Sequence, residues 1–370
     1  MKNYCPLPFG HLLSDTQGDY RICCEHRVPV EYRMNINQDH PDAWLTGEYI
    51  KQVRKSFENE HRHPGCSQCW RHEDSGRESL RTRSIKEYQI LGIRDHQSRL
   101  VNAELQVENL CNLTCIMCDP KSSSAILAEN TKLGLTSIKQ QEIGWNNTAW
   151  QNINWILDQG IRVLNIRGGE PLYNKKLLNI IENLPRDTAS LMVLHLTTNA
   201  TVWTDRWEQA LKKFGLVRFM FSIDAIDHRY EYIRFPSQWN TVEQNVQKIR
   251  TLVNAKCLVH AVVQNLNIGS IGELISWCDK QDIYLELDRL YNPAYLQITN
   301  LPSQYKDRVC VYLENLLNQR LQNHIRQFLE SCYTEIQQST FNNQLWKEFQ
   351  NQIGMRESLR GNNHRSIMEY

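Results

Sequence analysis

The sequence predicts an α/β fold, in which a parallel sheet forms a partial barrel between a cysteine-rich N-terminal segment and a helical C-terminal extension. Three observations support this prediction. Short apolar runs alternate with longer helical patterns between residues 100 and 290. Eight of the twelve cysteines lie in the first 118 residues, in tight groups, and residues 302–352 give helical patterns rich in Leu, Gln and Asn. At 370 residues, the chain is long enough to bury a substantial core.

The composition excludes several classes of protein. The formal net charge is +1, so no global field attracts nucleic acid or an anionic membrane. No apolar run approaches the roughly 18 residues of a spanning helix, and the N-terminus lacks the apolar stretch of a signal peptide. We therefore expect a soluble, cytoplasmic protein, in which clustered cysteines indicate metal binding rather than disulfides. Four scattered cysteines are expected to be ordinary buried thiols: Cys257, Cys278, Cys310 and Cys332.

The first hundred residues contain two groups of cysteines. Cys5 precedes a predicted hairpin around Gly18, whose second run ends in Cys23 and an adjacent cysteine, Cys24. Cys66 and Cys69 follow in a C-x2-C pair. A hairpin with cysteines and a later C-x2-C pair can bring four thiolates together and close a metal site completely. Zinc and an iron–sulfur cluster both fit this donor set.

Two further features of this region concern its surface. Trp44, Tyr49, Ile50, Val53 and Phe57 recur at helical spacing and predict an amphipathic helix with core-facing aromatic residues. Several arginines then follow the C-x2-C pair, and they fit either a solvated helix face or a patch for an acidic substrate: Arg71, Arg77, Arg81 and Arg83.

The region from 100 to 290 alternates strands and helices. The predicted strands are Leu100–Val107, Ile161–Ile166, Leu191–Leu196, Leu216–Ile223, Leu258–Val263 and Ile283–Leu287. Helical patterns lie around 120–134, 173–185, 204–214, 238–254 and 270–280. This alternation predicts parallel crossovers, and six units form a partial (β/α)6 barrel of the TIM type. The chemistry of such barrels gathers at the carboxyl ends of the strands.

A cysteine loop follows the first predicted strand. It reads Cys111-Asn-Leu-Thr-Cys115-Ile-Met-Cys118, so three thiolates lie within eight residues. Thiolate-only ligation selects zinc, copper(I) or iron–sulfur clusters. No fourth cysteine lies nearby in the sequence. The loop could therefore leave one metal position open, as catalytic sites do, or form a zinc knuckle closed by a distant ligand.

Polar motifs follow the next four strands as well. Gly168-Gly169-Glu170 comes after the second, and its glycines allow close approach of a ligand to the backbone. Asn199 follows the third strand and Asn265 the fifth. Ser222 ends the fourth, with Arg234 downstream, whose fork can bond both oxygens of a carboxylate.

This order of motifs over residues 100–290 resembles that of the radical S-adenosylmethionine (radical SAM) enzymes. The resemblance implies that Cys111, Cys115 and Cys118 hold a 4Fe–4S cluster whose open iron chelates SAM. It also implies that Gly168, Gly169 and Glu170 bind the methionine amino group. Ser222 and Arg234 would contact the ribose and carboxylate of SAM, Asn199 would stand at a polar strand end, and Asn265 would lie near the adenine and ribose.

The N-terminal pattern resembles the twitch or SPASM auxiliary-cluster module of such enzymes. The resemblance implies a second 4Fe–4S cluster on Cys5, Cys23, Cys66 and Cys69, with Cys23 favoured over Cys24 by its spacing from Gly18. Here the module precedes the barrel, whereas it usually follows it. The implied domains are an auxiliary iron–sulfur domain at 1–95, the barrel at 96–300 and the helical extension at 301–370.

The resemblance implies reductive cleavage of SAM to a 5′-deoxyadenosyl radical, which abstracts hydrogen from a substrate. Twitch and SPASM enzymes most often modify ribosomally made peptides, with outcomes that include cross-linking, epimerisation and backbone excision. The expected partners are a peptide substrate, a separate small leader-recognition protein and an external electron donor, without nucleic acid or membrane. The alternatives are a carbohydrate or small-metabolite dehydrogenase or mutase, and an electron-transfer or redox-sensing protein. Glu170 and Arg234 argue against the last class, because an electron carrier needs neither.

Overall fold

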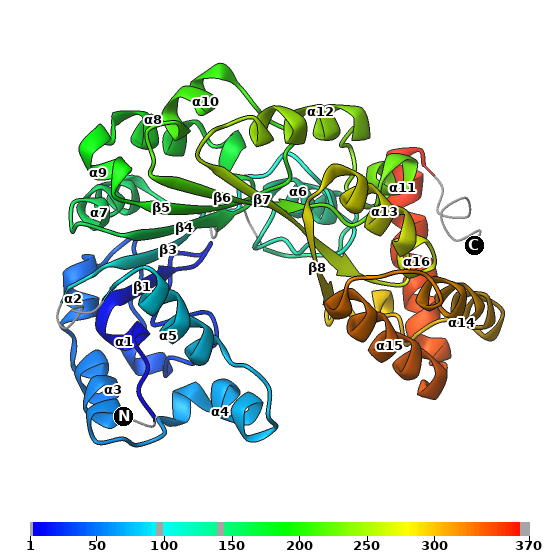
Figure 1. Cartoon of the computed structure of the whole chain (residues 1–370), viewed down its shortest axis with the longest axis horizontal. Helices are drawn as coiled ribbons and strands as arrows, with labels where there is room; N and C mark the ends of the chain where they lie inside the picture. Colours follow the sequence, from blue (N-terminus) through cyan, green and yellow to red (C-terminus); the bar gives the residue numbers. More distant parts are fainter. Residues whose placement is uncertain (1–2, 94–98, 139–143, 363–370) are drawn as a thin grey trace. The chain divides into compact units, whose positions relative to one another are not determined.

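The computed structural model describes residues 3–93, 99–138 and 144–362. It contains an α/β fold with an eight-stranded, mostly parallel sheet in the order β2-β1-β3-β4-β5-β6-β7-β8 (Figure 1). The strands are β1 (His11–Ser14), β2 (Tyr20–Arg21), β3 (Asn102–Val107), β4 (Val163–Gly168), β5 (Val193–Thr198), β6 (Leu216–Ser222), β7 (Ala255–Val263) and β8 (Tyr284–Arg289). The strands β3 to β8 follow one another in sequence order, as a partial barrel requires.

The α-helices of the described residues are α1 (Leu7–Gly10), α2 (Pro41–Leu45), α3 (Glu48–Glu58), α4 (Ser67–Asp74), α5 (Leu80–Ile90), α6 (Ser124–Lys132), α7 (Asn147–Leu157), α8 (Lys175–Asn183), α9 (Arg186–Ser190), α10 (Asp205–Leu211), α11 (Asp227–Ile233), α12 (Trp239–Arg250), α13 (Ile271–Gln281), α14 (Ser303–Leu317), α15 (Asn323–Gln338) and α16 (Asn343–Arg360). None of the helices described is both long and apolar enough to cross a membrane.

The chain divides into two compact units. The first comprises Met1–Cys111, Lys139–Leu196 and Asp205–Val217, and the second comprises Asn112–Ile138, Thr197–Thr204 and Arg218–Tyr370. The domain boundaries expected from the sequence, 1–95, 96–300 and 301–370, remain a prediction.

In the first unit, the N-terminal hairpin extends the sheet. Strands β1 and β2 pair antiparallel around Gly18, as the sequence predicts, and β1 also pairs in parallel with β3. The predicted amphipathic helix consists of two helices, α2 and α3. It breaks at Gly47, where a Cβ would lie 2.9 Å from the carbonyl oxygen of Ala43. The N-terminal cysteine segment is therefore joined to the sheet through backbone hydrogen bonds.

Helices α8 and α10 lie side by side over one face of β4 and β5 in the same unit (Figure 1). Helix α8 begins at Asn174, whose side chain accepts the backbone N–H groups of Lys176 and Leu177, and it buries an apolar stripe that includes Ile181. Trp207 of α10 donates its indole N–H to the carbonyl of Leu172 at 2.8 Å. This bond fixes α10 against the turn that follows the Gly-Gly-Glu motif.

In the second unit, strands β7 and β8 pair in parallel over six residues of register, from Leu258 opposite Tyr284 to Val263 opposite Arg289. Helix α15 packs against β8, where His324 stacks on Tyr284 and bonds the carbonyl of Leu285 at 2.9 Å. Helix α15 of the C-terminal extension therefore covers the last strand of the sheet order.

Candidate active site

The cysteine loop of the second unit is held by backbone hydrogen bonds to the end of α11. The Thr114 N–H donates to the Phe235 carbonyl at 2.7 Å, and the Ile116 N–H donates to the Ile233 carbonyl at 2.9 Å. Cys115, which lies between these two bonds, is buried, and Cys118 is half-buried. The loop therefore has a fixed course before any metal binds, and it lies directly beside Arg234.

Arg234 lies between a carboxylate and a cysteine sulfur. Its Nε donates to Asp224 Oδ2 at 2.8 Å, and its Nη1 lies 3.9 Å from Cys115 Sγ. Burial opposes the charge of Arg234, but Asp224 and Cys115 outweigh it and raise the pKa of the guanidinium. Burial raises the pKa of the Cys115 thiol, and the charge of Arg234 opposes that rise. Arg234 thus favours the thiolate form that a metal ligand requires.

Asp224, which the sequence analysis did not assign, joins the ends of β6 and β7. Its Oδ1 accepts the backbone N–H of Val262 at 2.8 Å, and its own carbonyl accepts from Asn267 Nδ2 at 2.9 Å. Asp224 is fully buried. The carboxylate is therefore a rigid anchor for Arg234. A polar residue directly after an apolar strand was the available signal for it.

The Gly-Gly-Glu motif lies in the first unit beside the segment that leads into Cys111. The Gly169 N–H donates to the Glu108 carbonyl at 3.0 Å, and the Glu170 N–H donates to the Leu110 carbonyl at 2.8 Å. A Cβ at Gly169 would collide with the backbone of Leu110, so only glycine fits this approach. The predicted motif and the first predicted cluster cysteine are therefore brought together.

The Glu170 carboxylate is almost fully buried, and its Oε1 accepts the backbone N–H of Leu172 at 2.9 Å. This bond caps the short turn η4 (Pro171–Tyr173) that follows the motif. Gly168 has a φ of +144°, a region that favours glycine. Glu170 therefore has a structural task in addition to the role in binding an ammonium group that remains a prediction.

Asn199 belongs to a polar ring in the second unit. Its Oδ1 accepts from the backbone N–H and the hydroxyl of Thr201, at 2.9 and 2.6 Å. Its Nδ2 donates to Asn112 Oδ1 at 3.2 Å, and Asn112 in turn donates to the Thr201 hydroxyl at 2.9 Å. Because Asn112 directly follows Cys111, the strand end at Asn199 is tied to the cysteine loop. The sequence analysis assigned no role to Asn112.

Two other predicted site residues, Ser222 and Asn265, lie at separate places in the second unit. Ser222 ends β6 and is half-buried. Asn265 is fully buried, and its side chain donates to the carbonyl of Tyr295 at 3.1 Å while its backbone N–H bonds Leu296. Asn265 thus braces the turn η6 (Ala294–Leu296), and its contact with a nucleoside remains a prediction.

The four cysteines predicted for the auxiliary site converge in the first unit. Cys5, Cys23, Cys66 and Cys69 line one pocket together with Arg81. Burial, and then the charge of neighbouring Cys69, raise the pKa of the Cys66 thiol to about 12, against the opposing charge of Arg81. A donor set of four thiols in one pocket fits a closed metal site, which must displace their protons on binding.

Cys24 lies apart from this pocket. It is exposed, and its electrostatic neighbours are Glu104 and Arg167 of the sheet. Arg81 is buried and forms an ion pair with Glu73. The Arg81 guanidinium lies inside the fold. Arg81 therefore belongs neither to a solvated helix face nor to a patch for an acidic substrate.

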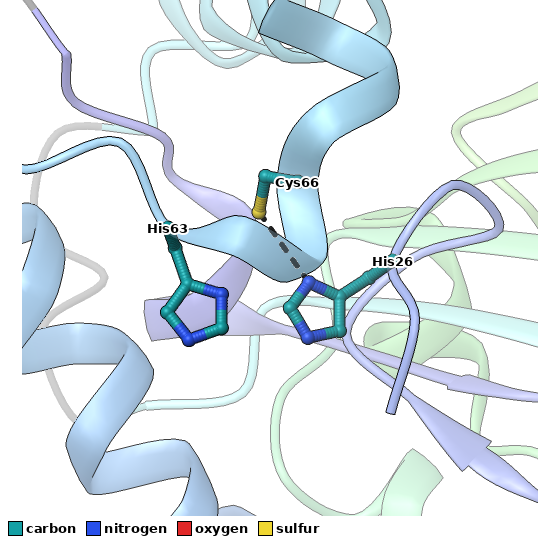
Figure 2. Close-up of side chains that lie close together, drawn as sticks. All are labelled: His26, His63 and Cys66. Carbon is teal, nitrogen blue, oxygen red and sulfur yellow. Dashed lines mark hydrogen bonds between the residues drawn. The ribbon is translucent and has the colours of Figure 1, made fainter. Parts of the chain in front are cut away.

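Two histidines that the sequence analysis missed lie beside Cys66. His26, His63 and Cys66 place one ligand atom each within 4.8 Å of the others (Figure 2). Burial, and then the charge of His63, lower the pKa of His26 to about 3, which keeps this imidazole neutral at pH 7. Isolated histidines separated by 37 residues give no spacing signal, so only folding reveals this group.

Comparisons with known proteins find similarity in the middle of the chain. Residues 106–278 match the family described as the Radical SAM superfamily. A probable GTP 3′,8-cyclase of Methanococcus aeolicus is 24% identical over 193 residues, which is 52% of this chain and 60% of the relative. The chain thus matches less than two thirds of the length of this relative.

Two solved structures resemble part of the fold. One is native anSMEcpe with bound AdoMet, with 17% identity, a TM-score of 0.40 and coverage of 58% of both chains. The other is Streptococcus suis SuiB bound to S-adenosylmethionine, with 16% identity, a TM-score of 0.38 and coverage of 64% of this chain and 48% of SuiB. The family match at residues 106–278 spans slightly less than half of the 370-residue chain.

Proposed function

We propose that the protein is a radical SAM enzyme that modifies a peptide or protein substrate. The observation that carries the proposal is the fixation of the cysteine loop: Glu170 bonds the residue before Cys111, and Arg234 lies beside Cys115. When bound, a 4Fe–4S cluster and SAM supply reductive cleavage to a 5′-deoxyadenosyl radical, which abstracts hydrogen from the substrate.

The residues of the chain have distinct tasks in this proposal. Cys111, Cys115 and Cys118 are the cluster ligands, and their all-thiolate donor set fits iron–sulfur chemistry. Arg234 balances the negative charge of the buried Cys115 thiolate and provides donors for a carboxylate. The backbone of Gly168 and Gly169 allows close approach of the amino end of SAM.

The peptide substrate rests on the auxiliary pocket. Cys5, Cys23, Cys66 and Cys69 line one pocket, as the twitch or SPASM pattern implies, and enzymes with such modules most often act on peptides. Four thiolates leave no open metal position, so this centre would carry electrons or brace the fold rather than bind substrate. A small leader-recognition protein and an external electron donor complete the proposed system.

A second candidate is a nucleotide substrate. Relatives at 24–29% identity include several named GTP 3′,8-cyclase or probable GTP 3′,8-cyclase. The chain matches 60% of the length of one of these relatives and 44% of the length of another, so this activity also stands as a proposal.

The two candidates are separated by substrate-dependent SAM cleavage. The reconstituted protein would be incubated anaerobically with SAM, a strong reductant and either a short peptide encoded beside its gene or GTP. A peptide substrate predicts 5′-deoxyadenosine formation coupled to a mass change of the peptide, with GTP left intact. Conversion of GTP with no change in any neighbouring peptide would favour the nucleotide candidate and contradict the peptide proposal.

A further inference from the structure

Beside the four-cysteine pocket lies a donor set of mixed chemistry. His26, His63 and Cys66 each direct one ligand atom towards the others, within 4.8 Å (Figure 2). Two imidazole nitrogens and one thiolate sulfur form a borderline-soft donor set, which suits zinc among the common divalent cations. Cys66 belongs to this group and also lines the four-cysteine pocket.

The backbone holds these side chains in place. The Arg27 N–H donates to the Gly65 carbonyl at 3.1 Å, and the Cys66 N–H donates to the His63 carbonyl at 3.0 Å. A Cβ at Gly65 would lie 2.7 Å from Cε1 of His26, so the turn η2 (Pro64–Cys66) packs directly on the His26 ring. The three donors are therefore brought together by the fold itself.

The hydrogen bonds also fix the tautomer of His26. The Tyr49 hydroxyl donates to the Arg27 carbonyl at 3.3 Å, so its oxygen is the acceptor in the 2.7 Å contact with His26 Nε2. The ring proton of neutral His26 is then on Nε2, and Nδ1 presents its lone pair towards Cys66. A histidine that binds a metal through one ring nitrogen usually donates the N–H of its other ring nitrogen to a hydrogen-bond acceptor.

The distance between two of the donors matches zinc geometry. His26 Nδ1 lies 3.4 Å from Cys66 Sγ. A tetrahedral zinc with bonds of about 2.0 Å to nitrogen and about 2.3 Å to sulfur places those atoms about 3.5 Å apart. His63 Nδ1 currently accepts the Gly65 N–H at 3.1 Å, a local bond that coordination through that nitrogen would replace.

We infer that His26, His63 and Cys66 form a binding site for a zinc-class divalent cation beside the four-cysteine site, whose pocket both Cys66 and His26 also line. Because Cys66 is a candidate ligand of both centres, we expect a cation bound here to weaken the bond between Cys66 and a metal cluster. The inference does not depend on SAM cleavage or on the nature of the substrate.

The test uses untagged, full-length, metal-free protein titrated anaerobically with Co²⁺, a spectroscopic substitute for zinc. The four-cysteine pocket and the cysteine loop also offer thiolates to Co²⁺, so we expect more than one bound Co²⁺, one of which has the d–d bands of mixed nitrogen and thiolate ligation and is displaced by Zn²⁺. His63→Ala should weaken this mixed-ligand binding at least tenfold. The matched control His61→Ala, at an exposed neighbouring position, should leave it unchanged.

A second pair of variants separates this site from the four-cysteine pocket. Cys5→Ser should remove only Co²⁺ with all-thiolate ligation and leave the affinity for Co²⁺ with mixed nitrogen and thiolate ligation within twofold, whereas Gly65→Ala, which displaces the His26 ring, should weaken the mixed-ligand binding. Near-UV circular dichroism would verify that each variant is folded. The inference is overturned if metal-free protein binds no Co²⁺ with mixed nitrogen and thiolate ligation, if His63→Ala binds it normally, or if Cys5→Ser loses it as His63→Ala does.

Discussion

Arg234 and Asp224 form a buried ion pair, with Nε of the guanidinium 2.8 Å from Oδ2 of the carboxylate. Only 10% of the Arg234 side chain and none of the Asp224 side chain is exposed. Since the same guanidinium lies beside Cys115, the pair couples the end of β6 to the cysteine loop. The position of a predicted SAM ligand is therefore set by a residue with no assigned role in the sequence.

The first prediction concerns this pair. Asp224→Asn should lower the free energy of unfolding by about 3 kcal/mol, because it leaves a buried cation without its partner. It should also lower SAM cleavage, because Arg234 is no longer held. Urea denaturation monitored by circular dichroism measures the first effect. Glu182→Gln, which breaks the exposed pair with Arg206, is the control and should change stability little.

The second prediction concerns the close approach at Gly169. A methyl group there would collide with the backbone of Leu110, so Gly169→Ala should displace the segment that carries Cys111. We expect less iron bound at the SAM cluster and at least tenfold slower SAM cleavage. Gly354→Ala is a matched control on α16, because a Cβ there meets open space and a helical glycine is otherwise unfavourable by about 0.5–1 kcal/mol. Normal iron content in Gly169→Ala would contradict the packing argument.

The third prediction concerns the C-terminal helix α16. Arg356 and Arg360 both form ion pairs with the buried carboxylate of Glu129, and Arg360 Nη2 donates to the carbonyl of Thr114 at 2.6 Å. Glu129→Gln should therefore destabilise the protein by about 3 kcal/mol and slow SAM cleavage through the cysteine loop. Lys347→Ala, at an exposed position of the same helix, should do neither. Equal stability of the two variants would show that the buried cluster contributes nothing.

Residues 356–370 are polar in sequence, which is compatible either with a tail that reaches back towards the barrel or with a frayed end. In the structure α16 continues to Arg360, and Arg356 is buried. The remainder of that tail, residues 363–370, lies outside the described residues. Helix α16 buries Phe349 and Ile353 in its middle, but its last turns bury the ion pairs of Arg356 and Arg360 instead of an apolar stripe, so the sequence pattern does not mark its end.

The fourth prediction concerns pH. His260 Nε2 lies 2.9 Å from Asp288 Oδ2, and although burial opposes its charge, the hydrogen bond and charge of Asp288 raise the pKa of His260. The pKa of His260 is therefore higher in the folded than in the unfolded protein. The pair with Asp288 contributes its full stabilisation at pH values below the unfolded pKa of about 6.5. This contribution is lost as the pH rises through the folded pKa.

Asp288→Asn should therefore lower the free energy of unfolding most near pH 5.5 and least near pH 9. The measurement is a series of urea denaturation curves for both proteins across that range. A difference between the two proteins that is constant with pH, or that grows towards pH 9, would contradict the assignment.

Strands and strand-end motifs could be predicted because their signals are local. Each run such as Leu216–Ile223 is short and apolar, and the observed β6, Leu216–Ser222, ends within one residue of it. Parallel strands direct their carboxyl ends to one edge, which is why strand order alone suggests site roles for Asn199, Ser222 and Gly169, and these roles remain predictions.

Long-range pairings could not be predicted in the same way. Nothing local to His11–Ser14 indicates that β1 pairs with β3, about ninety residues later. The bond from Asn199 to Asn112 also joins segments 87 residues apart. Helix α7, Asn147–Leu157, escaped prediction because asparagines interrupt its apolar pattern, although Asn146 caps it.

The most direct test of the account is SAM cleavage by the anaerobically reconstituted protein with dithionite. The account predicts 5′-deoxyadenosine from the wild type and from Cys310→Ala, a half-buried thiol outside both cysteine groups, and none from Cys118→Ala. Undiminished cleavage by Cys118→Ala, or a wild-type protein with a full cluster that leaves SAM intact, would contradict it.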